Sequence, residues 1–215
     1  MEYIKICGLK NFEDVRHCFD NGANALGFIY NVPDSPRNLK RSEILKILDK
    51  IPNNTNTVLV FKPGNIDELR KIIDQINVNL YQIHYKFNYS DLDKIPIELK
   101  NKIILALKVN QSNKENVINK INKYQDQFFA FLIDNSEGHG TEFNFDIVAD
   151  IINNTNRARL IIAGGININN IEKIIRDLNP YGIDVSSSLE SKKGVKDPLK
   201  IEIFLNKINE IKKTI

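Results

Sequence analysis

Short β-rich runs alternate with stretches of helical periodicity along the whole chain. In one such stretch, Phe12, Val15 and Phe19 recur at helical spacing. Eight runs end at turn or polar residues, and their ends recur roughly every 25 residues, about the length of one βα unit. The runs cover residues 3–7, 25–30, 57–61, 80–84, 103–107, 128–134, 159–164 and 182–187. This alternation predicts an α/β fold, a single TIM-type (β/α)8 barrel domain with a closed parallel sheet of eight strands over residues 1–215.

A doubly wound open sheet is the alternative architecture for alternating strands and helices. It usually needs fewer strands, and its dinucleotide-binding form carries a GxGxxG motif after the first strand. No such motif follows residues 3–7. The barrel is therefore favoured, and its loops must be compact, because the chain has 215 residues and barrels of this type typically have ~250.

Composition excludes several classes of partner. Hydrophobic residues make up 42% and charged residues 27% of the chain, as in ordinary soluble proteins. The net charge of +3 is too small to indicate nucleic acid or a membrane surface as partner. The longest apolar run, residues 128–133, is far too short to span a membrane, and we expect no signal peptide. Two cysteines make no disulfide framework, so we expect a reducing, cytoplasmic environment.

Chemically active side chains stand at the ends of several predicted strands. In a TIM barrel the active site lies at the carboxyl ends of the strands. Cys7 ends the first run, Arg37 lies in the loop after the second, His84 ends the fourth and Asp134 ends the sixth. A thiol, a guanidinium, an imidazole and a carboxylate are thus predicted to meet at one rim.

The last two strands end in residues that suit an anion. Gly164 and Gly165 allow backbone N–H groups to approach a phosphate closely, because no Cβ stands in the way. Ser186 and Ser187 would complete the site with hydroxyl and amide groups, in the position where such barrels commonly bind phosphate. The alternative is that the glycine pair only turns the chain and the serines cap a helix.

These motifs together resemble phosphoribosylanthranilate isomerases along the whole chain. The matching words are "KICGL" (5–9), "GFIY…SPR" (27–37), "QIH" (82–84), "LID" (132–134), "GHGTEF" (138–143), "AGGI" (163–166) and "DVSSSLE…GVKD" (184–197). The chain departs from the family pattern at Tyr85 and Ser188, where glycine is common, and in the loop over residues 137–145. Gln82, His84 and Asp184 are expected to line the substrate site. His84 and His139 are expected to form hydrogen bonds or to shape loops, and not to act in catalysis.

The resemblance implies an Amadori rearrangement in tryptophan biosynthesis. The substrate would be N-(5'-phosphoribosyl)anthranilate and the product 1-(2-carboxyphenylamino)-1-deoxyribulose 5-phosphate. By the same resemblance Cys7 is the general base, Asp134 is the general acid, and Arg37 contacts the anthranilate carboxylate. Two proton transfers suffice for this reaction, so we expect neither metal nor cofactor. The expected partner is the small phosphoribosyl substrate, and the protein is a monomer or homodimer.

The acid and the base need different environments. Asp134 can donate a proton only if it is protonated at rest, which burial or the anionic groups of the substrate would favour. Cys7 acts as a thiolate, so we expect a lowered pKa, with Lys5 on the same strand face as a source of positive potential. Lys5 and Asp184 each lie two residues before a rim residue, which predicts an ion pair where the barrel closes.

Other interpretations remain open at this point. Cys7 alone is consistent with a small buried hydrophobe, Asp134 with a helix N-cap, and Arg37 with a surface residue after a proline turn. Cys18 is expected to fill space in the first helix. For the whole chain, the alternatives are a different phosphosugar enzyme on the same barrel, or a non-catalytic phosphate-binding barrel that serves as a scaffold or regulator.

Overall fold

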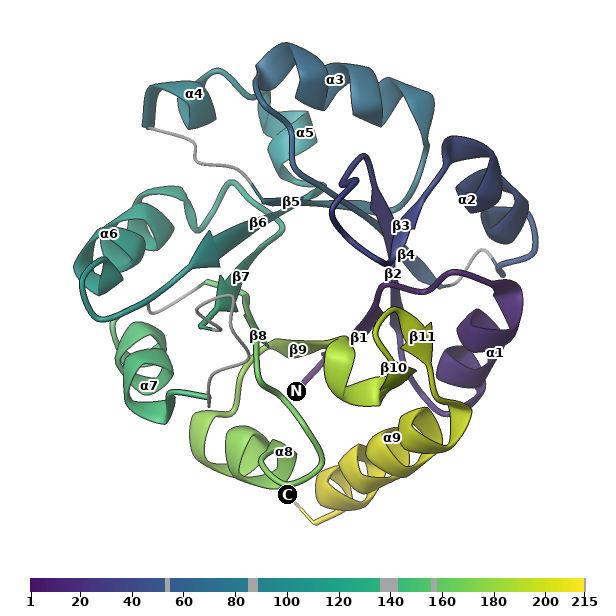
Figure 1. Ribbon diagram of the computed structural model, residues 1–215. Helices are drawn as coiled ribbons and strands as arrows, with labels where there is room; N and C mark the ends of the chain where they lie inside the picture. The colour runs from purple at the N-terminus through teal and green to yellow at the C-terminus, as the bar shows by residue number, and fades with distance from the viewer. Residues whose placement is uncertain (53–54, 85–88, 136–142, 156–157, 215) are drawn as a thin grey trace.

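The protein is a closed barrel of parallel strands surrounded by helices (Figure 1). The computed structural model describes residues 1–52, 55–84, 89–135, 143–155 and 158–214. The strands follow the order β1-β9-β8-β7-β6-β5-β4-β2-β3, and a further pairing of β1 with β2 closes the ring. All pairings within this sheet are parallel. The predicted (β/α)8 barrel is confirmed, and the predicted open-sheet alternative is excluded.

The eight barrel strands agree closely with the predicted runs. They are β1 (Tyr3–Cys7), β2 (Ala25–Tyr30), β4 (Asn56–Phe61), β5 (Leu80–His84), β6 (Ile103–Lys108), β7 (Ala130–Asp134), β8 (Leu160–Ala163) and β9 (Gly182–Val185). Two strands, β8 and β9, end earlier than predicted for local reasons. Gly164 ends β8 with a φ of 85°, and β9 stops before a 3-10 turn at Ser187–Leu189. Among the described residues, the short strand β3 (Asn38–Leu39) extends the barrel sheet beside β2, and β10 (Glu190–Lys192) and β11 (Val195–Lys196) form a separate two-stranded sheet.

Helices α1, α3, α7 and α9 begin where an asparagine or aspartate side chain caps their amide groups. Asn11 accepts from the Asp14 amide at 2.8 Å, Asn65 from Glu68 at 2.9 Å and Asn144 from Ile147 at 3.2 Å. The helices are α1 (Phe12–Asp20), α2 (Arg41–Leu48), α3 (Ile66–Gln75), α4 (Tyr89–Asp93), α5 (Ile97–Lys100), α6 (Lys114–Tyr124), α7 (Phe145–Asn153), α8 (Ile171–Lys173), which continues as a π-helical turn (Ile174–Leu178), and α9 (Pro198–Lys212).

Two apolar layers follow from the alternation of side chains along each strand. Ile4 and Ile6 of β1 belong to the larger layer, between the strands and the helices. Tyr3 and Cys7 belong to the smaller layer, inside the barrel. Lys5 lies on that inner face and is 0% exposed. The first strand therefore places an ammonium group inside the barrel, as its sequence predicts.

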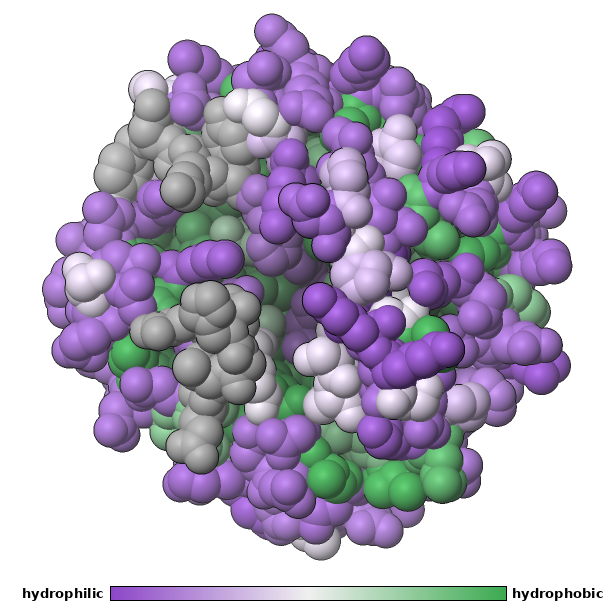
Figure 2. All heavy atoms as spheres, viewed as in Figure 1, coloured by the Kyte–Doolittle hydropathy of each residue, from purple (hydrophilic) through white to green (hydrophobic). Residues whose placement is uncertain are grey.

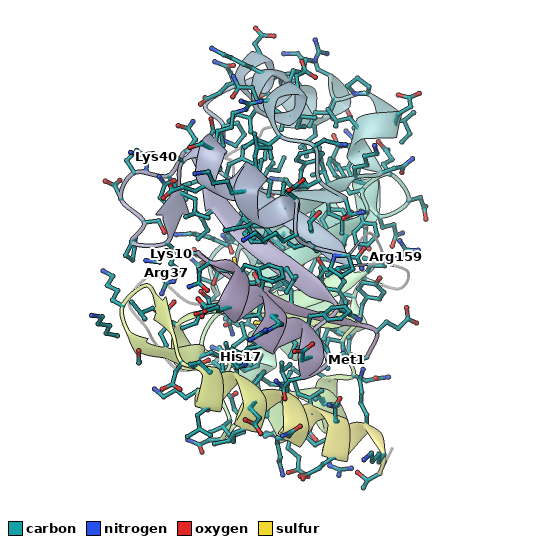
Figure 3. The ribbon with its side chains drawn as sticks, turned by 90° about the vertical axis from the view of Figure 1, so that its right-hand side faces the viewer. Met1, Lys10, His17, Arg37, Lys40 and Arg159 are labelled. Atoms are coloured by element: carbon teal, nitrogen blue, oxygen red, sulfur yellow. The ribbon has the colours of Figure 1, made fainter. Side chains whose placement is uncertain are left out.

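The two ends of the barrel differ. Figure 3 shows Arg37 and Lys40 at one end and Met1 and Arg159 at the other. The end with Arg37 is where the strands finish, and Figure 2 shows a hollow at its centre, bordered largely by hydrophilic residues. Among the described residues, no helix combines the length and the apolar character needed to cross a membrane.

Candidate active site

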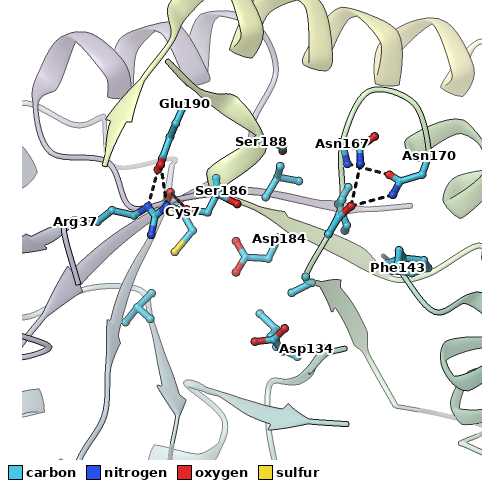
Figure 4. A pocket seen from close by; sticks show the side chains of 18 of the residues that line it. Cys7, Arg37, Asp134, Phe143, Asn167, Asn170, Asp184, Ser186, Ser188 and Glu190 are labelled. Carbon is cyan, nitrogen blue, oxygen red and sulfur yellow. Dashed lines mark hydrogen bonds and ion pairs between the residues drawn. The ribbon is translucent and has the colours of Figure 1, made fainter. Parts of the chain in front are cut away.

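A pocket of about 1280 Å³ opens at the carboxyl ends of the strands. Figure 4 shows Cys7, Asp134 and Asp184 pointing into it from three different strands. The residues that the sequence predicts for the site all line this one pocket: Cys7, Arg37, Gln82, His84, Asp134, Gly164, Gly165, Asp184, Ser186 and Ser187. The barrel thus brings together every predicted site residue, while their individual roles stay predictions.

Lys5, Cys7 and Asp184 form a polar group at the closing seam. Lys5 and Asp184 are register partners in β1 and β9, and the Lys5 Nζ lies 2.9 Å from the Asp184 Oδ1. The predicted ion pair is confirmed. Gly27 of β2 makes room for this group, because a Cβ there would lie 3.0 Å from both the Lys5 Nζ and the Cys7 Sγ. The ammonium is therefore next to both the carboxylate and the thiol.

The thiol of Cys7 does not have the lowered pKa that we expected. Burial raises its pKa above the ordinary value of 9.0, and the Lys5 ammonium only partly offsets this effect, while the Asp184 carboxylate adds to it. The expectation is wrong because strand spacing reveals that Lys5 shares the face of Cys7 but not how deeply the thiol is enclosed. Cys7 is 6% exposed. In the free protein it is held chiefly as the thiol.

Gln82 and His84 hydrogen-bond each other on the inner face of β5. The Gln82 Nε2 lies 3.0 Å from the His84 Nε2. Burial, with a smaller contribution from the positive charge of Lys5, lowers the pKa of His84 to about 4, so the imidazole is neutral near pH 7. The Oε1 of Gln82 is buried and has no hydrogen-bond partner. These two side chains supply neutral polar groups to the pocket, in line with the predicted binding role.

The carboxyl end of β7 places Asp134 in the pocket. Its backbone carbonyl accepts from the Val109 amide at 3.0 Å, and its register partners are Lys108 and Ala163. The side chain is partly exposed to the pocket. His139 and most of the "GHGTEF" word lie outside the described residues, as does Tyr85. Within the described part of the chain, no three His, Cys, Asp or Glu side chains cluster as a metal site requires.

Arg37 is held at the rim by a carboxylate that the sequence interpretation missed. Its Nε and Nη2 donate to the two carboxylate oxygens of Glu190, at 2.5 and 2.8 Å. The side chain crosses the backbone of Gly8, where a Cβ would lie 2.4 Å from the Arg37 Cδ. Gly8 also has a φ of 80°, so this position requires glycine on two grounds. Arg37 is therefore an ordered pocket residue and not a free surface arginine.

Glu190 and Lys196 belong to the β10–β11 hairpin and are almost fully buried. Lys196 Nζ lies 3.2 Å from the Glu190 Oε1, and the Gly194 amide donates to the Glu190 Oε2 at 2.9 Å. Burial alone would raise the pKa of Glu190, but the bonds from Arg37 and Gly194 and the charge of Lys196 lower it to about 2. Burial also lowers the pKa of Lys196, and Glu190 opposes that shift. Both residues stand in the "DVSSSLE…GVKD" word, which was the available signal.

Two consecutive glycines at the predicted phosphate site adopt backbone conformations that exclude other residues. Gly164 and Gly165 have φ values of 85° and 69°, which only glycine adopts without strain. Asn167 and Asn170 donate to the Gly165 carbonyl at 3.1 and 2.9 Å, as the dashed lines in Figure 4 show. The carbonyl is thereby occupied by amide side chains of this loop.

The serine run lies beside the glycine loop in the same pocket. The Ser186 hydroxyl donates to the Cys7 carbonyl at 3.0 Å, which ties the end of β9 to the end of β1. The Ser188 hydroxyl is buried without a partner. Ser186 therefore joins the predicted phosphate site to the strand that carries Cys7.

The chain matches the family model for "N-(5'phosphoribosyl)anthranilate (PRA) isomerase" over residues 4–207. It belongs to the phosphoribosylanthranilate isomerase family. Curated relatives with the name N-(5'-phosphoribosyl)anthranilate isomerase include a protein of Pelobacter propionicus, which is 31% identical, with 94% of this chain and 93% of the relative covered. A relative of the same name from Listeria innocua is 32% identical, with 94% and 95% covered.

Solved structures of the phosphoribosylanthranilate isomerase family share the barrel. One is a complex with reduced 1-(o-carboxyphenylamino)-1-deoxyribulose 5-phosphate; it is 26% identical, has a TM-score of 0.81, and covers 98% of this chain and 100% of its own. The enzyme from Thermotoga maritima has the same TM-score and identity, with 98% and 100% covered. A third structure, of mutually generated monomers of that dimeric enzyme, is 25% identical and also has a TM-score of 0.81.

Proposed function

We propose that this chain converts N-(5'-phosphoribosyl)anthranilate to 1-(2-carboxyphenylamino)-1-deoxyribulose 5-phosphate, with Cys7 as general base and Asp134 as general acid. It is an isomerase of tryptophan biosynthesis, as family membership gives. The observation that carries the residue assignment is the pocket itself. A thiol, a carboxylate, a guanidinium and the glycine–serine loops all line it, so each chemical group of one phosphoribosylated aminobenzoate has a partner there.

Two ends of the pocket would hold the two anionic ends of the substrate. The amides of Gly164, Gly165, Ser186 and Ser187 suit a phosphate, since hydrogen bonds to a fixed anion come from backbone N–H groups without side-chain rearrangement. Arg37 suits the aromatic carboxylate, because its guanidinium offers paired donors. Holding both ends places the ribose between Cys7 and Asp134.

Ring opening comes first. Asp134 gives its proton to the furanose ring oxygen as the bond from that oxygen to C1 breaks, and the nitrogen lone pair forms the C1=N double bond. The developing hydroxyl is then neutral, and Asp134 becomes a carboxylate. The positive charge now on nitrogen makes the hydrogen on C2 more acidic.

Cys7 first loses its thiol proton to solvent, and the thiolate then removes the C2 proton and becomes the thiol again. The electrons of that C–H bond form the C1=C2 bond of an enolamine, and the former imine nitrogen is neutral again. Tautomerisation moves the proton of the 2-hydroxyl to C1 and gives the ketone. Asp134 regains a proton from solvent before the next turnover. The raised pKa of the buried thiol makes its thiolate a stronger base. Lys5 supplies the adjacent positive charge that stabilises the thiolate when it forms.

The test is direct incubation with N-(5'-phosphoribosyl)anthranilate, followed by the loss of its anthranilate-type fluorescence. We expect turnover by the natural chain and little by Cys7→Ser. Absence of turnover together with tight binding of inorganic phosphate would instead support a non-catalytic phosphate-binding barrel. Turnover of another phosphosugar without this one would support a different enzyme on the same barrel.

The cellular location and the assembly of the protein are also part of the proposal. We infer a reducing, cytoplasmic location, which the two free cysteines support. A monomer or a homodimer remains our proposal for the assembly, and we propose that residues 1–215 work as one barrel domain. Sedimentation of the purified protein at several concentrations tests the assembly.

A further inference from the structure

We propose that the buried Glu190–Lys196 pair positions both anion-binding ends of the pocket, with Glu190 aiming the Arg37 guanidinium and Lys196 fixing the serine loop. This inference rests on the proposed function, in which Arg37 receives the carboxylate and the serine loop receives the phosphate. Neither residue touches the substrate in this proposal. They act through the groups that do.

The geometry of the guanidinium shows how Glu190 can hold Arg37 and still leave it able to bind. A guanidinium has five N–H donors, arranged so that a carboxylate can engage either the Nε side or the terminal end in a paired fashion. Glu190 takes the Nε side, through Nε and Nη2. The terminal pair, Nη1 with the second hydrogen of Nη2, is not used by Glu190. Arg37 lines the pocket, so this end is the one available to a second carboxylate.

Lys196 gives the cluster of Arg37, Glu190 and Lys196 a net positive charge. A lone Arg37–Glu190 pair has no net charge and attracts a substrate carboxylate weakly. Lys196, whose side chain is 1% exposed, adds a positive charge 3.2 Å from Glu190, whose side chain is 4% exposed. Arg37 and Lys196 carry two positive charges and Glu190 carries one negative charge, so the three together leave one net positive charge at the rim. Because the pair is buried, solvent screens this charge less than it would at the surface.

Lys196 also reaches the loop that is proposed to bind phosphate. Its Nζ donates to the Ser186 carbonyl at 2.9 Å. In a trans peptide the carbonyl oxygen and the following N–H point in opposite directions, and no described peptide bond is cis. Holding the Ser186 carbonyl toward Lys196 therefore turns the Ser187 N–H away from it. Ser187 lines the pocket whereas Lys196 does not, so this N–H is oriented on the pocket side.

Glu172 offers a matched control elsewhere on the molecule. It also pairs with one arginine and one lysine, with its Oε1 3.1 Å from the Arg176 Nε and its Oε2 2.8 Å from the Lys207 Nζ. This second cluster joins α8, the π-helical turn and α9, and Glu172 does not line the pocket. Glu172→Gln removes the same chemistry from a place where the proposal assigns no role.

The experiment measures two binding probes separately from turnover. Benzoate reports on the Arg37 end and inorganic phosphate on the glycine–serine end, each titrated calorimetrically into the natural chain, Glu190→Gln, Lys196→Met and Glu172→Gln. For Glu190→Gln we expect the Kd for benzoate to rise about 10- to 100-fold, because a misdirected guanidinium loses paired contacts. Its Kd for phosphate should stay within about twofold. Lys196→Met should weaken both probes about tenfold or more, and Glu172→Gln neither.

Turnover gives a second, independent readout. Both contacts are made in the bound substrate as well as in the transition state, so KM should rise in Glu190→Gln while kcat falls by less than about threefold. Unchanged benzoate binding and KM in Glu190→Gln would overturn its positioning role. Unchanged phosphate binding in Lys196→Met would overturn the role of Lys196. Equal weakening of both probes in Glu190→Gln would reveal general damage to the rim and equally reject selective positioning.

A double variant addresses loss of folding. Removing one charge of a buried pair leaves the other uncompensated, whereas Glu190→Gln/Lys196→Met removes both. The double variant is expected to melt close to the natural chain and still to bind benzoate and phosphate about tenfold more weakly. Natural affinity in a folded double variant would reject the proposal. Failure of the natural chain to turn over the substrate, with the probe pattern intact, would reject the proposed function alone.

Discussion

Gly27 is a single position where the absence of a side chain determines the chemistry of its neighbours. A Cβ there would lie 2.9 Å from the Lys5 Cε and 3.0 Å from the Cys7 Sγ. Lys5 is 0% exposed, so its side chain has no solvent to move into. The ammonium can therefore lie beside the thiol and the Asp184 carboxylate only because glycine occupies the adjacent strand.

Replacement of the proposed base tests the role of Cys7 against a control in the same chain. Cys7→Ser should keep the fold, since the side chains are similar in size, but lower kcat by about 10²–10⁴-fold, because a hydroxyl is a far poorer base. Asp134→Asn should lower it likewise by removing the transferable proton. Cys18→Ser should change the melting temperature more than the rate, as Cys18 is 0% exposed. Normal turnover by Cys7→Ser would reject this assignment.

The raised pKa of Cys7 has its own measurable consequence. Below its pKa, the thiolate fraction rises about tenfold for each pH unit, and the thiolate is the form that alkylating reagents attack. Because burial raises the pKa of Cys7 above 9.0, the rate of Cys7 alkylation should still be rising at pH 9. Bound product should protect the thiol.

Cys18 again serves as the control, since burial raises its pKa to about 12 and it lies outside the pocket. It should remain unmodified throughout. A rate of Cys7 alkylation that levels off near pH 7 would contradict the raised pKa. Peptide mapping after timed exposure to iodoacetamide distinguishes the two cysteines.

At the scale of elements, the loops after β8 and β9 shape the end of the pocket where we propose that phosphate binds. The two glycines after β8 have positive φ values, and two asparagine side chains hold the second carbonyl. After β9 the chain enters a 3-10 turn and then the β10–β11 hairpin, which carries Glu190 and Lys196. The loop after β8 thus has backbone groups with no side chain beside them, and the loop after β9 contacts the buried charged residue Lys196.

Gly165→Val tests the glycine loop. A β-branched side chain would stand in the path of a phosphate and would also strain a backbone with a φ of 69°. We expect KM for the phosphoribosyl substrate to rise about tenfold or more, with a smaller change in kcat.

Gly22→Val is matched for backbone strain, because Gly22 has a φ of 101° but lies away from the pocket. It should lower the melting temperature and leave KM unchanged. A KM that stays the same in a folded Gly165→Val would exclude the phosphate site from this loop. Steady-state kinetics and thermal unfolding of both variants provide the comparison.

The sequence predicts those parts of the site that depend on strand ends. Cys7 and Asp134 stand out because each ends a predicted strand, while their roles come from the family resemblance. The parity of Lys5 and Asp184 follows from strand alternation, which is a local pattern. Glu190 and Lys196 were missed as functional residues because their place depends on how a hairpin folds back over the rim. The predicted direction of the Cys7 pKa shift was wrong, because residue spacing alone does not measure depth of burial.

At the scale of the whole molecule, the closing seam joins the two ends of the barrel sheet. Lys5 of β1 pairs with Asp184 of β9, and the Ser186 hydroxyl reaches the Cys7 carbonyl. The helix α9 then packs against α1 on the outside. Figure 1 shows these first and last segments side by side. The seam is therefore held by charge inside the barrel and by helix packing outside it.

Acid should destabilise the barrel through His84. Its pKa is about 4 in the folded protein and 6.5 in its unperturbed form, so between these values the unfolded chain binds more protons. The free energy of unfolding should therefore fall as the pH drops from 6.5 to 4, by about 1–3 kcal/mol from this residue. Glu190, with a pKa of about 2 against 4.5, adds a further fall below pH 4.5.

His84→Gln isolates this contribution, because the amide keeps a polar group but does not titrate. Urea unfolding at pH 4 and pH 7 should show a smaller difference for the variant than for the natural chain. His17, in the last turn of α1 and outside the pocket, gives the control variant His17→Gln. An equal pH dependence in all three proteins would exclude His84 as the titrating group.

The seam also sets an order of events during synthesis. Arg37 and Glu190 are separated by 153 positions, and Lys5 and Asp184 by 179. A nascent chain on the ribosome therefore carries Cys7 long before it carries the carboxylate and the amides that surround it. Until β9 and the loop after it have emerged, Lys5 lacks its counter-ion Asp184 across the seam and the rim lacks its serine loop. The site around β1 is incomplete until β9 has been synthesised. Catalytic competence is therefore acquired only as translation nears α9.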